Sequence, residues 1–110
     1  MFVVTNRVPV VESFREQFEE RFRQRAGQVE KQPGFIRMEI MRPIDEDSPY
    51  LVMTTWQDEE AFNNWVGSED FKLAHQNPLP KEAYKTTGGG MEQHTIIITA
   101  QTAEVKPGDR

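Results

Sequence analysis

Four short segments of this 110-residue chain carry the apolar alternation or β-branched pattern of strands, and amphipathic segments separate them. The predicted strands are residues 2–8, 35–42, 50–56 and 91–101. A short, turn-rich loop joins the second and third strands, which predicts an antiparallel hairpin. In the first strand, Asn6 shares a face with apolar neighbours, where a carboxamide needs a partner if it is buried.

The segment between the first two strands predicts a helix over roughly residues 13–31. Ser13-x-x-Glu16 has the form of a capping box, and Pro33-Gly34 is a strong stop. Apolar residues recur every three or four positions, as expected for one buried helix face. They are Phe14, Phe18, Phe22, Ala26 and Val29.

Two shorter helices are predicted after the third strand. Asp58 begins one and Ser68 begins the other, which runs to about His75. The resulting order β-α-β-β-α-β predicts an α+β fold, a ferredoxin-like sandwich with helices on one face of an antiparallel sheet. The bare face needs a cover, and a second copy is the simplest one, so we expect a homodimer. We expect one domain over residues 1–102 and a flexible polar tail over 103–110.

Composition excludes several classes of function. The chain has no cysteine, which removes disulfides, thiolate metal sites and Cys nucleophiles. A net charge of −5 counts against nucleic-acid binding. No apolar run approaches a membrane span, and the N-terminus lacks the pattern of a signal peptide. We therefore expect no membrane insertion and a cytoplasmic location.

A few side chains could carry chemistry, and each has two interpretations from the sequence alone. His75 could be a metal ligand or a helix-capping surface residue. Asn6 could face a ligand cavity or simply reach backbone groups or solvent. Trp65 could wall a pocket or pack in the core. Arg21 and Arg25, four apart on one helix, could bind ligand carboxylates or form ordinary surface ion pairs.

Taken together, these positions resemble the antibiotic-biosynthesis-monooxygenase superfamily. Within it, they resemble the heme-degrading monooxygenases of the staphylococcal and mycobacterial type. The resemblance covers about residues 2–101, and the combination of Asn6, Trp65 and His75 is its specific part. The other matching motifs are Glu20-Arg21-Phe22-x-x-Arg25, Pro33-Gly34-Phe35, Trp56-x-x-x-x-Ala61-Phe62-x-x-Trp65 and Phe71-x-x-x-His75.

The resemblance implies a role for each of these residues and a dimeric α/β barrel. His75 would bind the heme iron, and Asn6 would donate a hydrogen bond to the ligand on the opposite side. Trp65 would press on the porphyrin and distort it, and Phe22 would contact the ring. Arg21 and Arg25 would meet the propionates. Heme would be both cofactor and substrate, opened with O₂ and electrons from an external donor, either a separate reductase or a small reductant.

Two alternatives remain open at this stage. One is a cofactor-independent quinol or aromatic monooxygenase of the same superfamily, in which His75 meets no iron. The other is a heme-binding dimer without turnover. The Pro- and Gly-rich loop from Asn77 to Gly90 departs from the family pattern. The cleavage position of the ring, and whether carbon leaves as CO or formaldehyde, are therefore not predicted.

Overall fold

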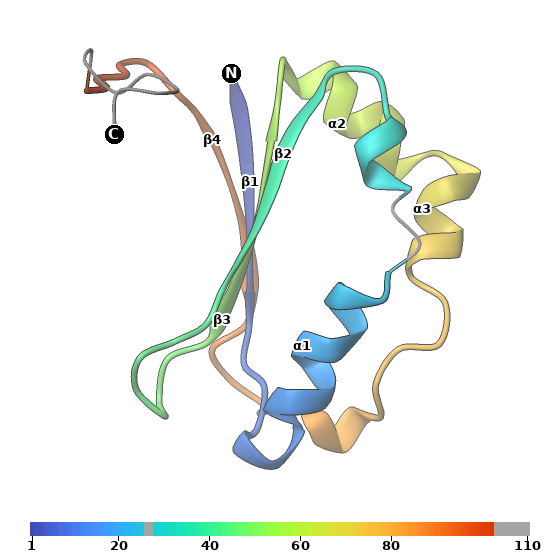
Figure 1. Ribbon diagram of the computed structural model, residues 1–110, viewed down its shortest axis with the longest axis vertical. Coiled ribbons are helices and arrows are strands. Elements are labelled where there is room, and N and C mark those ends of the chain that lie inside the picture. The colour runs from blue at the N-terminus through green and yellow to red at the C-terminus, as the bar shows by residue number, and fades with distance from the viewer. Residues whose placement is uncertain (26–27, 103–110) are drawn as a thin grey trace, which may run out of the picture.

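A computed structural model describes residues 1–25 and 28–102, in which the chain forms an antiparallel sheet with helices over one face (Figure 1). In these residues the sheet has four strands, in the order β2-β3-β1-β4. The predicted ferredoxin-like order is confirmed, whereas the predicted tail, residues 103–110, lies outside the described residues. The strands and α-helices are β1 (Phe2–Val8), α1 (Arg15–Arg23), β2 (Phe35–Met41), β3 (Tyr50–Trp56), α2 (Glu59–Val66), α3 (Glu69–Ala74) and β4 (Gly90–Thr95). Short 3₁₀ turns are Glu12–Phe14, Val29–Lys31 and Lys81–Ala83.

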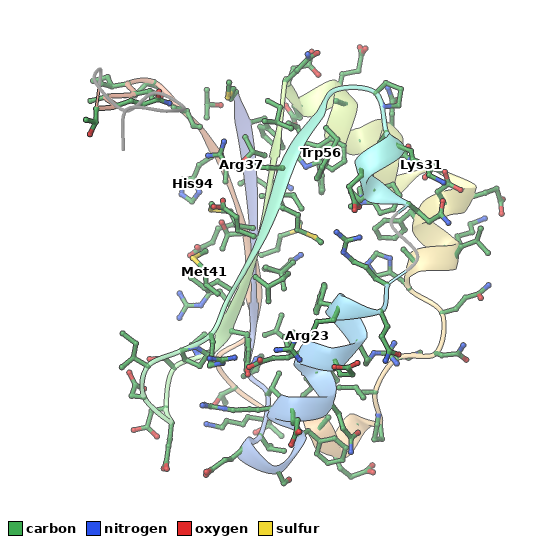
Figure 2. The ribbon with its side chains drawn as sticks, in the orientation of Figure 1. Arg23, Lys31, Arg37, Met41, Trp56 and His94 are labelled. Atoms are coloured by element: carbon green, nitrogen blue, oxygen red, sulfur yellow. The ribbon has the colours of Figure 1, made fainter. Side chains whose placement is uncertain are left out.

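The two faces of the sheet differ in what covers them. Trp56 points toward the helices, whereas Arg37, Met41 and His94 project from the opposite face (Figure 2). We call that opposite side the outer face. The sheet does not close on itself, because β2 and β4 are its edges within the described residues. A barrel would therefore require a second copy of the chain.

Apolar side chains between the sheet and the helices form two core clusters. One cluster surrounds Trp56, which is fully buried and whose indole N–H donates to Thr54 Oγ1 at 2.9 Å. Its buried members are Phe2, Val4, Val29, Trp56, Ala61 and Trp65. The second cluster joins α1 to the sheet and contains Val10, Phe18 and Tyr50 as buried members. Of the helices in the described residues, none combines the length and apolar character needed to cross a bilayer.

The first helix is shorter than the sequence predicted. α1 ends at Arg23, and Val29 lies in a separate 3₁₀ turn; Ala26 lies outside the described residues. The predicted stripe is divided because Phe18 and Val29 pack in different core clusters. The predicted capping box was also wrong. Ser13 lies inside the 3₁₀ turn Glu12–Phe14 before α1, whereas a capping residue has an extended backbone.

The last strand also ends early, at Thr95 rather than at Gln101. Thr95 lies opposite Phe2, the first residue of β1, so β4 has no neighbouring strand beyond this point. A final backbone bond joins the Ile96 N–H to the Met1 carbonyl. Ile97 and Ile98 are consequently 86% and 83% exposed.

Candidate functional site

His75 lies directly after α3. Ser68 begins this helix by accepting a hydrogen bond from the Phe71 N–H, as the sequence predicted, and His75 is its C-cap. The His75 Nδ1 atom lies 2.7 Å from the Phe71 carbonyl oxygen. Because a carbonyl only accepts, Nδ1 carries the proton, and Nε2 of the neutral ring has a free lone pair. The side chain is exposed, so this nitrogen is available to a metal ion.

Aromatic contacts connect His75 to the core. The His75 ring lies against Phe71 with a centroid distance of 4.0 Å, and Phe71 meets Trp65 edge-to-face at 5.4 Å. Trp65 itself is buried in the cluster around Trp56. It is held there by α2, whose predicted N-cap Asp58 accepts from the Ala61 N–H at 2.9 Å. Core packing is therefore a role that the structure assigns to Trp65, and it supports the Phe71–His75 pair.

Asn6 lies on the side of the sheet that faces the helices. It lies on the same face of β1 as the buried Val4, and its strand neighbours are Val52 and Met91. Although the helices cover this face, Asn6 is exposed. Other polar groups of this face are hydrogen-bonded, such as the Tyr50 hydroxyl and the Trp56 indole N–H. Among the described residues, the Asn6 carboxamide has no such side-chain bond. The amide is therefore free to meet a ligand that enters between the sheet and the helices.

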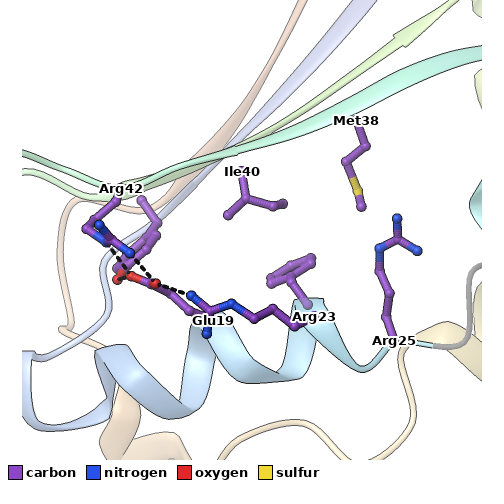
Figure 3. Close-up of a pocket in the computed structure, with 8 residues that line it drawn as sticks. Glu19, Arg23, Arg25, Met38, Ile40 and Arg42 are labelled. Atoms are coloured by element: carbon purple, nitrogen blue, oxygen red, sulfur yellow. Dashed lines mark hydrogen bonds and ion pairs between the residues drawn. The ribbon is translucent and has the colours of Figure 1, made fainter.

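A cleft of about 460 Å³ lies between α1 and the β2–β3 hairpin (Figure 3). Its size falls within the usual range for small-molecule sites. Phe22, Met38 and Ile40 give it an apolar surface. Its polar lining consists of Glu19, Arg23, Arg25, Arg42 and Tyr50.

The Glu19 carboxylate binds three other side chains of this cleft. Glu19 accepts two hydrogen bonds from Arg42, at 2.7 and 2.6 Å, one from Arg23 at 3.0 Å, and one from the Tyr50 hydroxyl. The Arg42 bonds, followed by that of Tyr50, lower the pKa of Glu19 to about 2. Burial, and then the hydrogen bond to Glu19, raise the pKa of Tyr50. Glu19 therefore stays ionised and ties α1 to the hairpin.

Arg21 and Arg25, the two arginines that were predicted to meet ligand carboxylates, have separate partners. Arg25 forms a two-pronged ion pair with Glu30, at 2.9 and 2.8 Å, and this hydrogen bond lowers the pKa of Glu30. Arg21 Nη2 donates to the Gln76 carbonyl at 3.5 Å. The Arg21 bond joins α1 to the residue that follows His75.

Comparison with known proteins places the chain in a family. Residues 1–77 match the family model described as "Antibiotic biosynthesis monooxygenase". The chain belongs to this family. It is 39% identical over 79 residues to a staphylobilin-producing heme oxygenase of Staphylococcus haemolyticus, a match that covers 70% of this chain and 75% of the relative. The predicted resemblance to heme-degrading members is therefore confirmed.

Solved structures agree with the fold of this antibiotic-biosynthesis-monooxygenase member. The heme degrader MhuD from Mycobacterium tuberculosis, solved with two hemes in its active site, has a TM-score of 0.75 and 27% identity. That match covers 92% of this chain and 100% of the MhuD chain. SnoaB, a cofactor-independent oxygenase from Streptomyces nogalater, has a TM-score of 0.61 and 24% identity, covers 94% of this chain and 97% of its own, and supports the fold alone.

The structure divides the predicted site residues of this family member into two groups. Phe22 and Arg25 line the cleft. Asn6, Trp65 and His75 do not line it, although the Arg21–Gln76 bond connects the cleft helix to the residue beside His75. The remaining cleft residues were not predicted from the sequence. These are Glu19, Arg23, Met38, Ile40, Arg42 and Tyr50.

The sequence pattern around two of these residues could have placed them on the side of the sheet that faces the helices. Met38 and Ile40 alternate on the strand face that was predicted to be apolar. The partnership of Glu19 with Arg42, by contrast, spans 23 residues and depends on how α1 crosses the hairpin. No local pattern specifies that crossing.

Proposed function

We propose that this protein is a heme-degrading monooxygenase, in which heme is the substrate that is opened to a linear tetrapyrrole with release of iron. The observation that carries the proposal is the exposed His75, whose Nδ1 is anchored on the Phe71 carbonyl so that Nε2 is free. An imidazole whose Nδ1 is held in this way by a backbone carbonyl is a common axial ligand of heme iron. The names of the staphylococcal relative and of MhuD support the same substrate.

The donor set fits a heme. An apolar macrocycle with two carboxylates needs apolar walls and cations, and Phe22, Met38 and Ile40 lie beside Arg25 in the cleft. Arg25 would bind a propionate, and Arg21, which lies within α1, is a second candidate. Bound heme supplies the iron chemistry with O₂, and the protein supplies binding, orientation and electrostatics.

The remaining residues orient that chemistry. His75 would bind the iron through Nε2, and Asn6 would donate from its amide N–H to a ligand of the bound heme. Trp65 would contact the macrocycle from the core and distort it. We place the reaction in the cytoplasm, where a separate reductase or a small reductant supplies electrons.

We also propose that the working form is a homodimer that pairs two outer faces into a barrel. Half-buried Leu51 and Met53 lie on the outer face, next to the exposed Met41 on β2. Ile97 and Ile98 add further exposed apolar surface just beyond β4. Burying such a patch is a typical reason for self-association. Sedimentation equilibrium at micromolar concentration should give twice the chain mass, and a monomer there would contradict this proposal.

A second candidate is a cofactor-independent oxygenase that acts on an aromatic substrate. The observation that favours it is that His75 does not line the cleft, so an aromatic ring against Phe22 and Met38 would meet no iron ligand. The fold shared with SnoaB is compatible with this reading.

One assay separates these functions from simple heme binding. Hemin is added to the protein, followed by ascorbate in aerated buffer. The loss of the Soret band and trapping of ferrous iron by a chelator should both occur with the wild type. Stable bound hemin would indicate a carrier. Oxygen uptake with a hydroquinone in the absence of hemin binding would support the second candidate.

A further inference from the structure

The ion pair between Arg25 and Glu30 stands at the cleft where a ligand carboxylate is expected. Arg25 follows the end of α1, and Glu30 lies in the 3₁₀ turn Val29–Lys31. Two guanidinium nitrogens of Arg25 reach the two oxygens of Glu30, at 2.9 and 2.8 Å. This is the fork geometry in which arginine binds any carboxylate. Figure 3 shows the Arg25 side chain extending toward Met38 across the cleft.

The other two cations of the cleft share a carboxylate that the protein mostly covers. Arg42 and Arg23 both bond to Glu19, whose side chain is 15% exposed and which also accepts from Tyr50. Glu30 is 47% exposed, and within the described residues Arg25 is the partner of its side chain. Exposed ion pairs are weak because water competes with them. Of the three cleft cations in the described chain, Arg25 is therefore the one whose carboxylate partner is most accessible to a competing ligand.

We propose that Glu30 is a latch on Arg25: a carboxylate of the ligand binds Arg25 only by displacing Glu30. This inference rests on the proposed function, since it takes the ligand to be an amphipathic porphyrin dicarboxylate. A ligand with a free carboxylate replaces the bonds that Arg25 loses. A neutral ligand of the same shape has no carboxylate to compete for Arg25 and leaves the Arg25–Glu30 pair in place. Glu30 thus lowers the affinity of the cleft for the acid form of the ligand, whereas the affinity for a neutral ligand does not depend on Glu30.

Replacing Glu30 by Gln tests the latch. The substitution leaves Arg25 without its internal carboxylate and removes a negative charge that repels the ligand. We expect hemin to bind about two- to fivefold more tightly, as follows from the strength of exposed ion pairs. Hemin dimethyl ester, which has the same ring and iron but no carboxylate, should bind both proteins equally.

The affinities are measured by quenching of tryptophan fluorescence, so turnover is not needed. Glu46→Gln is the matched control, because it removes one exposed carboxylate in the β2–β3 loop and leaves the cleft unchanged. Unchanged or weaker hemin binding by Glu30→Gln, or an equal gain for the dimethyl ester, would overturn the latch. If both porphyrins bind as expected but no ring opening occurs, the latch stands and the proposed function fails. If neither binds the wild type, both proposals are rejected.

Discussion

Replacing Glu19 by Gln should remove the electrostatic link between α1 and the β2–β3 hairpin. In the native protein, Arg42 donates two hydrogen bonds to this carboxylate and the Tyr50 hydroxyl donates another. Gln keeps the approximate shape of the side chain but has one acceptor oxygen and no charge. The guanidinium of Arg42 then loses its ionic partner on α1.

The pKa of Glu19 gives the scale of the effect. The hydrogen bonds from Arg42, followed by that of Tyr50, lower this pKa from 4.5 to about 2. Each pKa unit corresponds to ~1.4 kcal/mol. The ionised Glu19 side chain therefore contributes at most about 3 kcal/mol to the free energy of unfolding. Because Arg42 is 65% exposed and its charge is screened by water, we expect a loss of about 1–2 kcal/mol in Glu19→Gln.

The pH dependence has a defined direction. A carboxyl group whose pKa is depressed by folding stabilises the folded state above 4.5, and that contribution disappears as the pH falls toward about 2. Urea unfolding at fixed protein concentration should therefore show the full difference at pH 7 and a shrinking difference as the pH is lowered below 4.5. Glu20→Gln is the control, because Glu20 is exposed and its ion-pair partner is the surface residue Arg23. Equal stability of the two variants at pH 7 would refute the reasoning.

Three further substitutions test the site and its support. If the Asn6 amide assists the bound ligand, Asn6→Ala should leave hemin affinity within about twofold but slow turnover at least about tenfold. Unchanged turnover would remove that role. Asn63→Ala, on α2, is the control. Trp65→Phe should lower the free energy of unfolding by about 1–3 kcal/mol through lost core volume and shift the Raman markers of porphyrin planarity; unshifted markers would limit Trp65 to packing. Gly34→Ala should destabilise the fold by about 2 kcal/mol or more. Gly34 has φ 81°, and a Cβ there would lie 2.6 Å from Ala61 Cβ. An unchanged melting temperature would contradict this expectation.

Features set by neighbouring residues could be predicted from the sequence. β1 and β3 were predicted with the observed bounds because alternation along a strand is local. The caps Asp58 and Ser68 were also predicted correctly, since each side chain bonds within its own first turn. These elements place Asn6, Trp65 and His75.

Features set by distant partners could not be predicted. β4 ends at Thr95 because β1 supplies no further pairing positions, although Ile96 to Thr99 remain strongly β-prone in sequence. α1 ends at Arg23 while Val29 packs into the other core cluster. The roles proposed for Asn6, Trp65 and His75 stay predictions, because they came from resemblance and concern contacts with a ligand.

The most direct test of the central claim is a hemin titration of wild-type and His75→Ala protein, followed by the position of the Soret band. The proposed ligation predicts that hemin gives a shifted, saturable Soret band with the wild type and that His75→Ala loses this shift. His94→Ala, on the outer face, should behave as the wild type. If His75→Ala keeps the wild-type Soret spectrum, His75 does not bind the iron.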